Sequence, residues 1–346
     1  MLRVQCRTIL GSFSVFLAAI GPLSTLGCSS LRQIFQPFTS SCVTDNQIAA
    51  KDREAANQAA IQFVQSSLGP TPGVAYSAFT ADAKKSVSSE EFTAMLQQDV
   101  QRMGPFKDLR VTHTYLAKVT GGTQVQRVVC GNFSRPENWV AVAAKPGPPQ
   151  AHVIVEGQTI NNTWAFVIWL FPEQENWHVQ YFQVATATMA GKSAIDLQSM
   201  AQVEQLAHHN FNAYILYAAA LQLAARGPHF QLGIQPEIQK SIGELQVPRD
   251  LQGQPPFEWE FGKSSFKVLN VGPIAIGGKI YLKIDHEIES WAANREADKK
   301  NHDLIAAFAN AYPEYKDAFS GLIVNAHERG GSRGFGTVDE HRKPSQ

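Results

Sequence analysis

Charge is scarce in this sequence, and neither sign dominates. Charged residues make up 17% of the 346 residues, and 30 basic side chains balance 30 acidic ones. Soluble domains typically contain roughly a quarter charged residues. Binding of nucleic acid needs a clustered basic surface, and binding to an anionic membrane surface needs a polybasic stretch. The sequence offers neither, so we expect no nucleic acid partner.

Motifs of metal, phosphate and nucleophile chemistry are incomplete. Asp285-His286-Glu287 and the adjacent His208-His209 lack the H-E-x-x-H spacing that places two imidazoles on one helix face. Residues 272–279 approach a phosphate-binding loop, but an extra glycine precedes the lysine and no Ser or Thr follows it. Residues 330–334 match G-x-S-x-G, yet a predicted helix precedes them where a nucleophile elbow needs a strand. The sequence predicts no metal and no cofactor, and it does not favour catalysis.

The first 27 residues have the pattern of a secretion signal. Arg3 and Arg7 are their only charged residues, and an apolar run covers residues 9–20. This run is shorter than the roughly 20 residues that a membrane-spanning helix needs. Gly21-Pro22 then interrupts any helix. We predict that residues 1–27 are a signal peptide.

A small residue, Gly27, stands directly before Cys28. This resembles the lipobox of bacterial lipoproteins, in which a peptidase cuts before a cysteine that then carries diacylglycerol and an acyl chain. The resemblance implies lipidation at Cys28, and Ser29, which is not aspartate, implies sorting to the outer membrane, facing the periplasm. Thr25 departs from the lipobox, which prefers leucine there. Cleavage nearby, giving a secreted or soluble periplasmic protein, and an uncleaved anchor remain open.

Four cysteines are present, and two of them are left for the folded protein. Cys6 leaves with the signal, and Cys28 is assigned to the lipid. Cys42 and Cys130 remain as an even pair in an oxidising compartment, where such thiols commonly form a disulfide. The alternative is two separate buried thiols. The sequence has no C-x-x-C motif, so a zinc ribbon or a thioredoxin-type redox site is not expected.

Residues 28–45 are predicted to form a tether, and residues 46–190 a first α+β domain. Helical periodicity predicts helices over residues 45–68, 74–85 and 88–103, and Ser88 with Glu91 gives the last one a capping box. Alternating apolar and polar residues then predict a curved antiparallel sheet. Its strands are expected over residues 109–118, 124–132, 139–144, 151–156, 164–171 and 177–185.

Three helices followed by such a sheet resemble the nuclear transport factor 2-like superfamily. The resemblance covers about residues 46–188 and rests on Glu90-Glu91-Phe92 at a helix start and on Glu175-Asn176-Trp177-His178-Val179 in the closing hairpin. It implies a cone-shaped sheet wrapped around a helix, often with a pocket. Trp164, Trp177 and His178 could line that pocket, although tryptophans on a sheet more often belong to the core.

Residues 191–346 are predicted to form a second, helix-rich α+β domain with a mobile C-terminal tail. Expected in order are a long helix over residues 195–225, strands over 257–261, 266–271 and 279–286, and helices before and after Pro313. The later helix is expected to bury Leu322 and Ala326. Short matches, such as Gly69-Pro70 with Gly227-Pro228, suggest a divergent, truncated copy of the first domain.

These features predict an envelope lipoprotein that binds a protein partner or a small apolar ligand without catalysis. One alternative is an isomerase or hydrolase that uses a pocket acid or a histidine such as His178, because an apolar setting can shift the pKa of an imidazole. A second alternative is a structural scaffold of the envelope. A lipid group with more than one acyl chain at Cys28 would hold the binding protein or the scaffold firmly at the membrane.

Overall fold

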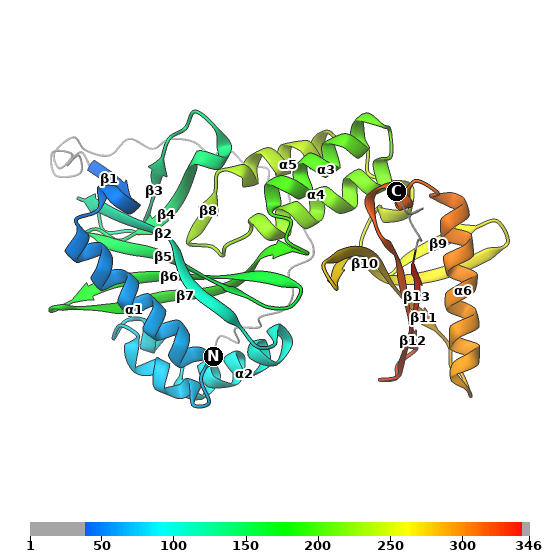
Figure 1. Ribbon diagram of the computed structural model, residues 1–346, viewed down its shortest axis with the longest axis horizontal. Coiled ribbons are helices and arrows are strands. Elements are labelled where there is room, and N and C mark those ends of the chain that lie inside the picture. The colour runs from blue at the N-terminus through cyan, green and yellow to red at the C-terminus, as the bar shows by residue number, and fades with distance from the viewer. Residues whose placement is uncertain (1–38, 341–346) are drawn as a thin grey trace, which may run out of the picture.

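The computed structural model describes residues 39–340, which fold into two lobes (Figure 1). The fold class is α+β, as predicted. Each lobe is built on a five-stranded sheet. Helices α3 (Ala194–Leu206), α4 (Asn210–Ala224) and α5 (Ile234–Glu244) lie between the two sheets. Within residues 39–340, no helix is both long enough and apolar enough to cross a bilayer. The predicted signal and Cys28 lie outside the described residues.

The first lobe is organised by a sheet in which every neighbouring pair of strands is antiparallel. Its order is β1 (Thr39–Thr44), β2 (Lys107–Thr120), β5 (Gln150–Gln158), β6 (Asn162–Glu173) and β7 (Asn176–Met189). The strand predicted over residues 164–171 is confirmed as the centre of β6, where Ala165 to Leu170 are all buried. This strand is apolar on both faces because both faces of the sheet are covered.

Helices α1 (Ala50–Leu68) and α2 (Ser89–Met103) cover one face of the first sheet. The predicted capping box begins α2. The Glu91 amide donates to the Ser88 hydroxyl at 3.2 Å, and the Ser88 amide donates to the Glu91 carboxylate at 3.0 Å. These bonds satisfy two of the amide groups that a helix start leaves without partners.

The helix predicted over residues 74–85 is wrong. Two short 3-10 turns, Pro72–Ala78 and Ala83–Lys85, occupy this stretch. Between them the backbone extends, because Phe79 forms a bridge with Val179 of β7 and the Thr80 amide donates to the Val179 carbonyl at 2.9 Å. Pairing with the sheet thus outweighs the local helical pattern.

A three-stranded sheet covers the other face of the first sheet. Its strands are β3 (Gln126–Gly131), β4 (Trp139–Ala144) and β8 (Phe230–Leu232). The short β8 comes from the stretch that the sequence assigned to the second domain, and it pairs with β4. The chain after the domain boundary predicted near residue 190 therefore still contributes one strand, β8, to the first lobe.

A disulfide between Cys42 and Cys130 ties β1 to β3, as predicted. The two Cα atoms are 5.1 Å apart, which is within the usual range for a disulfide. The predicted tether is too long, because residues 39–44 form β1. This strand pairs with β2 from Thr39 opposite Thr120 to Thr44 opposite Tyr115.

The single helix predicted over residues 195–225 is two helices, α3 (Ala194–Leu206) and α4 (Asn210–Ala224), which pack against each other. His208 between them has a left-handed φ of 63°, which ends the helical hydrogen-bond ladder. Glu204 stabilises the corner: its carboxylate lies 2.9 Å from His209 Nδ1 and accepts from the Asn212 amide at 2.8 Å.

The second sheet has the order β13 (Gly334–Glu340), β12 (Gly321–Glu328), β11 (Lys279–Ile288), β10 (Ser264–Ile276) and β9 (Phe257–Phe261). Helices α6 (Asn294–Ala311) and α7 (Tyr315–Ala318) complete the lobe, whereas α5 (Ile234–Glu244) packs on α4 between the two sheets. β11 and β12 are parallel and are connected through α6 and α7, whereas the first sheet is antiparallel throughout. The two sheets differ in topology, so the structure does not support the suggested duplication.

The helix predicted after Pro313 is wrong beyond Ala318, and so is the mobile tail up to Glu340. Strands β12 and β13 occupy these residues and pair with each other. β12 is buried on both faces, and a continuous apolar run fits helical spacing as well as it fits a central strand. The G-x-S-x-G match at residues 330–334 lies at the β12–β13 hairpin turn.

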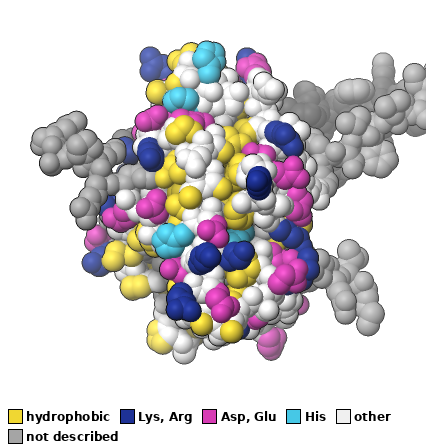
Figure 2. Space-filling view, turned by 90° about the vertical axis from the view of Figure 1, so that its right-hand side faces the viewer, with side chains coloured by type: hydrophobic (Ala, Val, Ile, Leu, Met, Phe, Trp, Pro, Cys, Tyr) yellow, Lys and Arg dark blue, Asp and Glu magenta, His cyan; other side chains and the backbone are white. Residues whose placement is uncertain are grey.

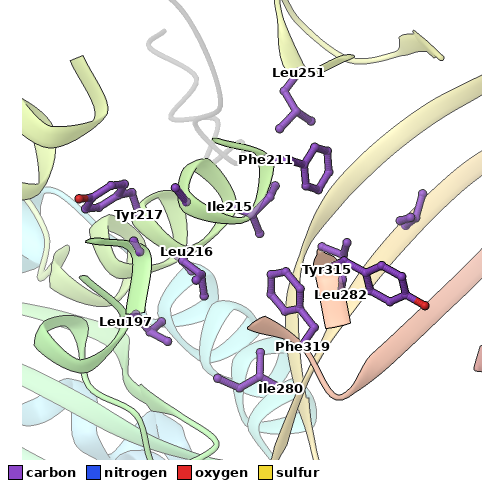
Figure 3. Close-up of a cluster of buried hydrophobic side chains, with 14 of the residues drawn as sticks. Leu197, Phe211, Ile215, Leu216, Tyr217, Leu251, Ile280, Leu282, Tyr315 and Phe319 are labelled. Carbon is purple, nitrogen blue, oxygen red and sulfur yellow. The ribbon is translucent and has the colours of Figure 1, made fainter. Parts of the chain in front are cut away.

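The largest core joins the helices between the lobes to the second sheet (Figure 3). Phe211 of α4 packs edge-on against Trp259 of β9 and Phe308 of α6, with ring centroids 6.2 Å and 5.3 Å apart. Trp259 and Phe308 stack at 5.7 Å. Because α4 also packs against β7 of the first lobe, this core connects the two halves of the molecule.

Candidate functional site

The structure does not bring Trp164, Trp177 and His178 together. On the β6–β7 hairpin, Trp164 lies opposite Thr186 and Trp177 lies opposite Pro172, so the two indoles are at opposite ends. Both pack against the apolar core beneath α1 and α2. His178 adjoins Trp177 and therefore points to the other face of the strand. None of the three lines either of the two cavities described below.

Aromatic rings fill the space between α1, α2 and the first sheet. Phe63 lies 5.0 Å from Phe182, and Phe79 lies 5.0 Å from Phe92, both in edge-on contacts. Phe63, Phe79 and Phe92 are buried.

The larger of the two cavities is in the second lobe and has a volume of about 640 Å³. It lies between strands β9 to β11, the segment of residues 289–291 and the first half of α6, and we call it the α6 cleft. Apolar side chains from Phe266, Ile288 and Trp291 form part of its lining. The charged residues around them are Glu258, Lys267, Glu287, Glu289, Glu296, Lys299, Lys300 and Arg329.

Trp291 is held rigidly in the α6 cleft. Its side chain is 5% exposed, and the Arg333 guanidinium lies over the ring, 4.6 Å from its centroid. Arg333 also donates to the Trp291 carbonyl at 2.9 Å. The indole Nε1 is buried, and no acceptor for it occurs within residues 39–340. A buried donor without an acceptor costs about 1–3 kcal/mol, and a ligand in the cleft would not relieve this cost because the nitrogen itself is inaccessible.

His286 forms part of the wall of the cleft and is nearly fully buried. Its Nε2 lies 2.7 Å from Asn301 Oδ1, while the Asn301 amide nitrogen donates to Thr337 and to the Phe335 carbonyl, both at 3.0 Å. Because the Asn301 oxygen accepts, Nε2 carries the proton. Burial lowers the pKa of His286, since the charged imidazolium is disfavoured away from water. A neutral, fixed imidazole is the result.

Charges of both signs form a network at the mouth of the cleft. Glu287 accepts from Lys267 Nζ and from Arg329 Nε, both at 2.9 Å, and Arg329 also donates to Glu289 at 2.5 Å. The hydrogen bond from Lys267 is the main cause that lowers the pKa of Glu287. Figure 2, which shows the right-hand side of Figure 1, has Lys and Arg interspersed with Asp and Glu on this face. A surface of this kind is complementary to a ligand that carries both positive and negative charges.

The other motif residues have structural roles. Asp285 points away from His286, to the opposite face of β11, and accepts from Lys283 at 2.8 Å and from Asn325 at 2.9 Å. Burial raises the pKa of Asp285, but these donors outweigh it, so the net shift is downward. His208 and His209 form the α3–α4 corner. No group of three or more metal-ligating side chains occurs within the described part of the chain.

The structure is that of a two-lobed α+β protein with a cleft lined by charges of both signs. No family model, curated protein or solved structure matches the chain. The resemblance of residues 46–188 to the nuclear transport factor 2-like superfamily therefore stays a prediction.

Proposed function

We propose that this protein is a lipid-anchored component of the bacterial cell envelope that binds a partner in the α6 cleft without catalysis. The lipid is attached at Cys28, and the protein faces the periplasm from the outer membrane. The observation that carries the proposal is the cleft itself: a cavity of about 640 Å³ with a rigid, buried Trp291 and charges of both signs around it.

The Cys42–Cys130 disulfide supports a location outside the cytoplasm. Disulfides persist in the periplasm and on cell surfaces, whereas cytosolic reductants keep thiols reduced. Cys130 is buried beneath the three-stranded sheet, so the bond is built into the packing of the first lobe. This agrees with a signal peptide that directs the chain out of the cytoplasm.

The cleft lining indicates the chemistry of the partner. Trp291, Phe266 and Ile288 offer apolar contact, and aromatic rings are frequent at the energetic centre of protein interfaces. The alternating charges of Lys267, Glu287 and Arg329 would orient a polar rim around that centre. We infer an envelope protein segment with one apolar or aromatic residue flanked by acidic and basic ones.

The anchor is tested by the intact mass of the protein extracted from membranes. We expect residues 28–346 plus a diacylglyceryl and an acyl group, and a gain of two hydrogens on reduction from the single disulfide. A mass that begins elsewhere and carries no lipid would contradict the anchor and favour a secreted or soluble periplasmic protein.

Binding is tested by a photo-reactive amino acid placed at Lys300, an exposed residue of α6 that lines the cleft. The matched control is Lys51, an exposed residue of α1 in the first lobe. We expect one specific cross-linked protein from Lys300 in living cells, none from Lys51, and loss of the product when Trp291 is also replaced by alanine. Equal products from both positions would favour the scaffold, and none from Lys300 would contradict binding at the cleft.

A further inference from the structure

A second cavity, of about 230 Å³, lies between the first sheet, the start of α3 and the segment that connects α4 to α5. We call it the Arg226 cavity. Its exposed side is formed by His113, Glu137 and Ile195. Buried side chains that line it include Ile154, Ala187, Ala194, Arg226, Phe230 and Ile234. The cavity is therefore open to solvent on one side and apolar in its depth, apart from one guanidinium.

Arg226 is 8% exposed and is held at the end of α4. Its NH1 group donates to the Thr186 carbonyl at 3.0 Å and to the Ala225 carbonyl at 3.3 Å, and it also bonds the Leu223 carbonyl. The Leu223 carbonyl belongs to the final turn of α4 and Ala225 caps that helix, at the end where the helix dipole favours a positive charge. One guanidinium nitrogen thus fixes the side chain in place.

The other nitrogens of Arg226 are not used by the protein. Within residues 39–340, neither Nε nor NH2 has a hydrogen-bond partner, and no carboxylate lies within 4.0 Å of the guanidinium. A guanidinium has five N–H donors, and its planar fork matches a carboxylate with two parallel bonds. Burial lowers the pKa of Arg226 to about 10, so the group is still charged at neutral pH. Glu156 favours the charged form electrostatically, but no carboxylate of the described residues is in direct contact with this buried charge, which is costly.

An acidic side chain lines the same cavity without touching Arg226. Glu156 of β5 is half-buried, and it interacts with Arg226 electrostatically without a direct ion-pair contact in the described residues. Glu137, at the exposed side, is 3.9 Å from Arg135, a contact between two solvent-exposed side chains. Exposed pairs of this kind contribute little. The cavity therefore presents a fixed cation and two carboxylates that are separated from it.

We propose that the Arg226 cavity binds a small zwitterion of the α-amino acid class. The ligand carboxylate bonds the free edge of Arg226, its ammonium group lies near Glu156 and Glu137, and its side chain contacts Ala187 and Phe230. A carboxylate alone would neutralise Arg226 but would also face both glutamates, whereas a zwitterion satisfies both signs. This site is separate from the α6 cleft, so the failure of either proposal leaves the other untouched.

The test measures the thermal unfolding midpoint of the full mature chain with each of three probes at equal millimolar concentration. The probes are L-valine, isovalerate and isobutylamine. Isovalerate lacks the ammonium group of L-valine, and isobutylamine lacks its carboxylate. We expect L-valine to raise the midpoint by about 3 °C at roughly ten times its Kd, isovalerate to raise it less, and isobutylamine not at all. No shift with L-valine would overturn the site. Equal shifts with L-valine and isovalerate would overturn the role of the glutamates.

Two variants locate the effect. Arg226→Gln is expected to abolish the response to L-valine, although it also loses bonds at the end of α4. Ala187→Leu fills the cavity from β7 without changing a charge, and it is expected to abolish the response as well. Ala55→Leu, on the exposed side of α1, is the matched control and should respond like the wild type. A response to L-valine that survives Ala187→Leu would place binding elsewhere and overturn the proposal.

Discussion

Removing the disulfide by the double substitution Cys42→Ala/Cys130→Ala is expected to lower the free energy of unfolding by roughly 4 kcal/mol. The bond joins residues 88 apart in the sequence, so it strongly restricts the unfolded chain. It also holds β1, an edge strand that pairs with β2, against the buried Cys130 on β3. Alanine is used because a serine hydroxyl at the buried position 130 would need a new hydrogen-bond partner.

Urea unfolding of the oxidised wild type and of the double variant measures this difference. The control is reductant, which should lower the midpoint of the wild type to that of the variant and leave the variant itself unchanged. If the oxidised wild type and the variant unfold at the same urea concentration, the bridge does not stabilise the fold. A difference that persists under reductant would assign the loss to the packing at position 130 instead.

Several strands of the first lobe could be predicted because the sequence alternates there and β5, β6 and β7 are joined by local hairpins. The predicted strand at residues 139–144 matches β4, and the strand at 177–185 lies within β7. Alternation fails where both faces are buried. Leu322 to Val324 of β12 are apolar in succession, and only their pairing with β11 and β13 decides between strand and helix.

Long-range pairing also explains the other errors. Residues 39–44 are polar and look like a tether, but the disulfide and six pairs with β2 make them a strand. Three residues of β8 join a sheet whose other strands lie about 90 positions earlier in the chain. A single sequence carries no signal for contacts of this kind, because neither strand shows which partner it will meet.

The site residues were missed for a related reason. Trp291 follows β11 in an irregular segment, so no periodicity marks it as part of a cleft. Arg226 did carry a signal: it stands two residues after the apolar helix α4, where a charge must either reach solvent or find a buried role. Trp164 and Trp177 were selected because tryptophans are conspicuous, yet both are partly buried and pack against the core, the commoner role for a tryptophan on a sheet.

The burial of His152 could not be predicted from the sequence. Because this histidine is buried, we expect the free energy of unfolding to fall steeply in acid. His152 lies on β5, fully buried, where its Nε2 donates to the Ala143 carbonyl at 2.7 Å and its ring stacks on Trp169. Burial lowers the pKa of His152 to about 4, the bond to Ala143 opposes this shift, and the neighbouring His229 adds to it. Protonation would place a charge beneath the three-stranded sheet without water.

The sign of the pH effect follows from the two pKa values. An unfolded chain protonates this imidazole near pH 6.5, whereas the folded protein keeps it neutral until about pH 4. Between these values the unfolded state binds more protons, so stability falls as the pH falls. The difference amounts to about 3 kcal/mol lost between pH 6.5 and 4, and the contribution is fully retained above pH 6.5.

The variant His152→Gln separates this residue from the other groups that titrate in the same range. Glutamine can donate to the Ala143 carbonyl in place of Nε2 but cannot be protonated. We expect the free energy of unfolding, measured in urea from pH 7 to pH 4, to fall by about 3 kcal/mol less in the variant than in the wild type. His302→Gln, at an exposed position on α6, controls for the loss of one histidine. Parallel profiles for the wild type and His152→Gln would show that the buried imidazole is not the source of the acid sensitivity.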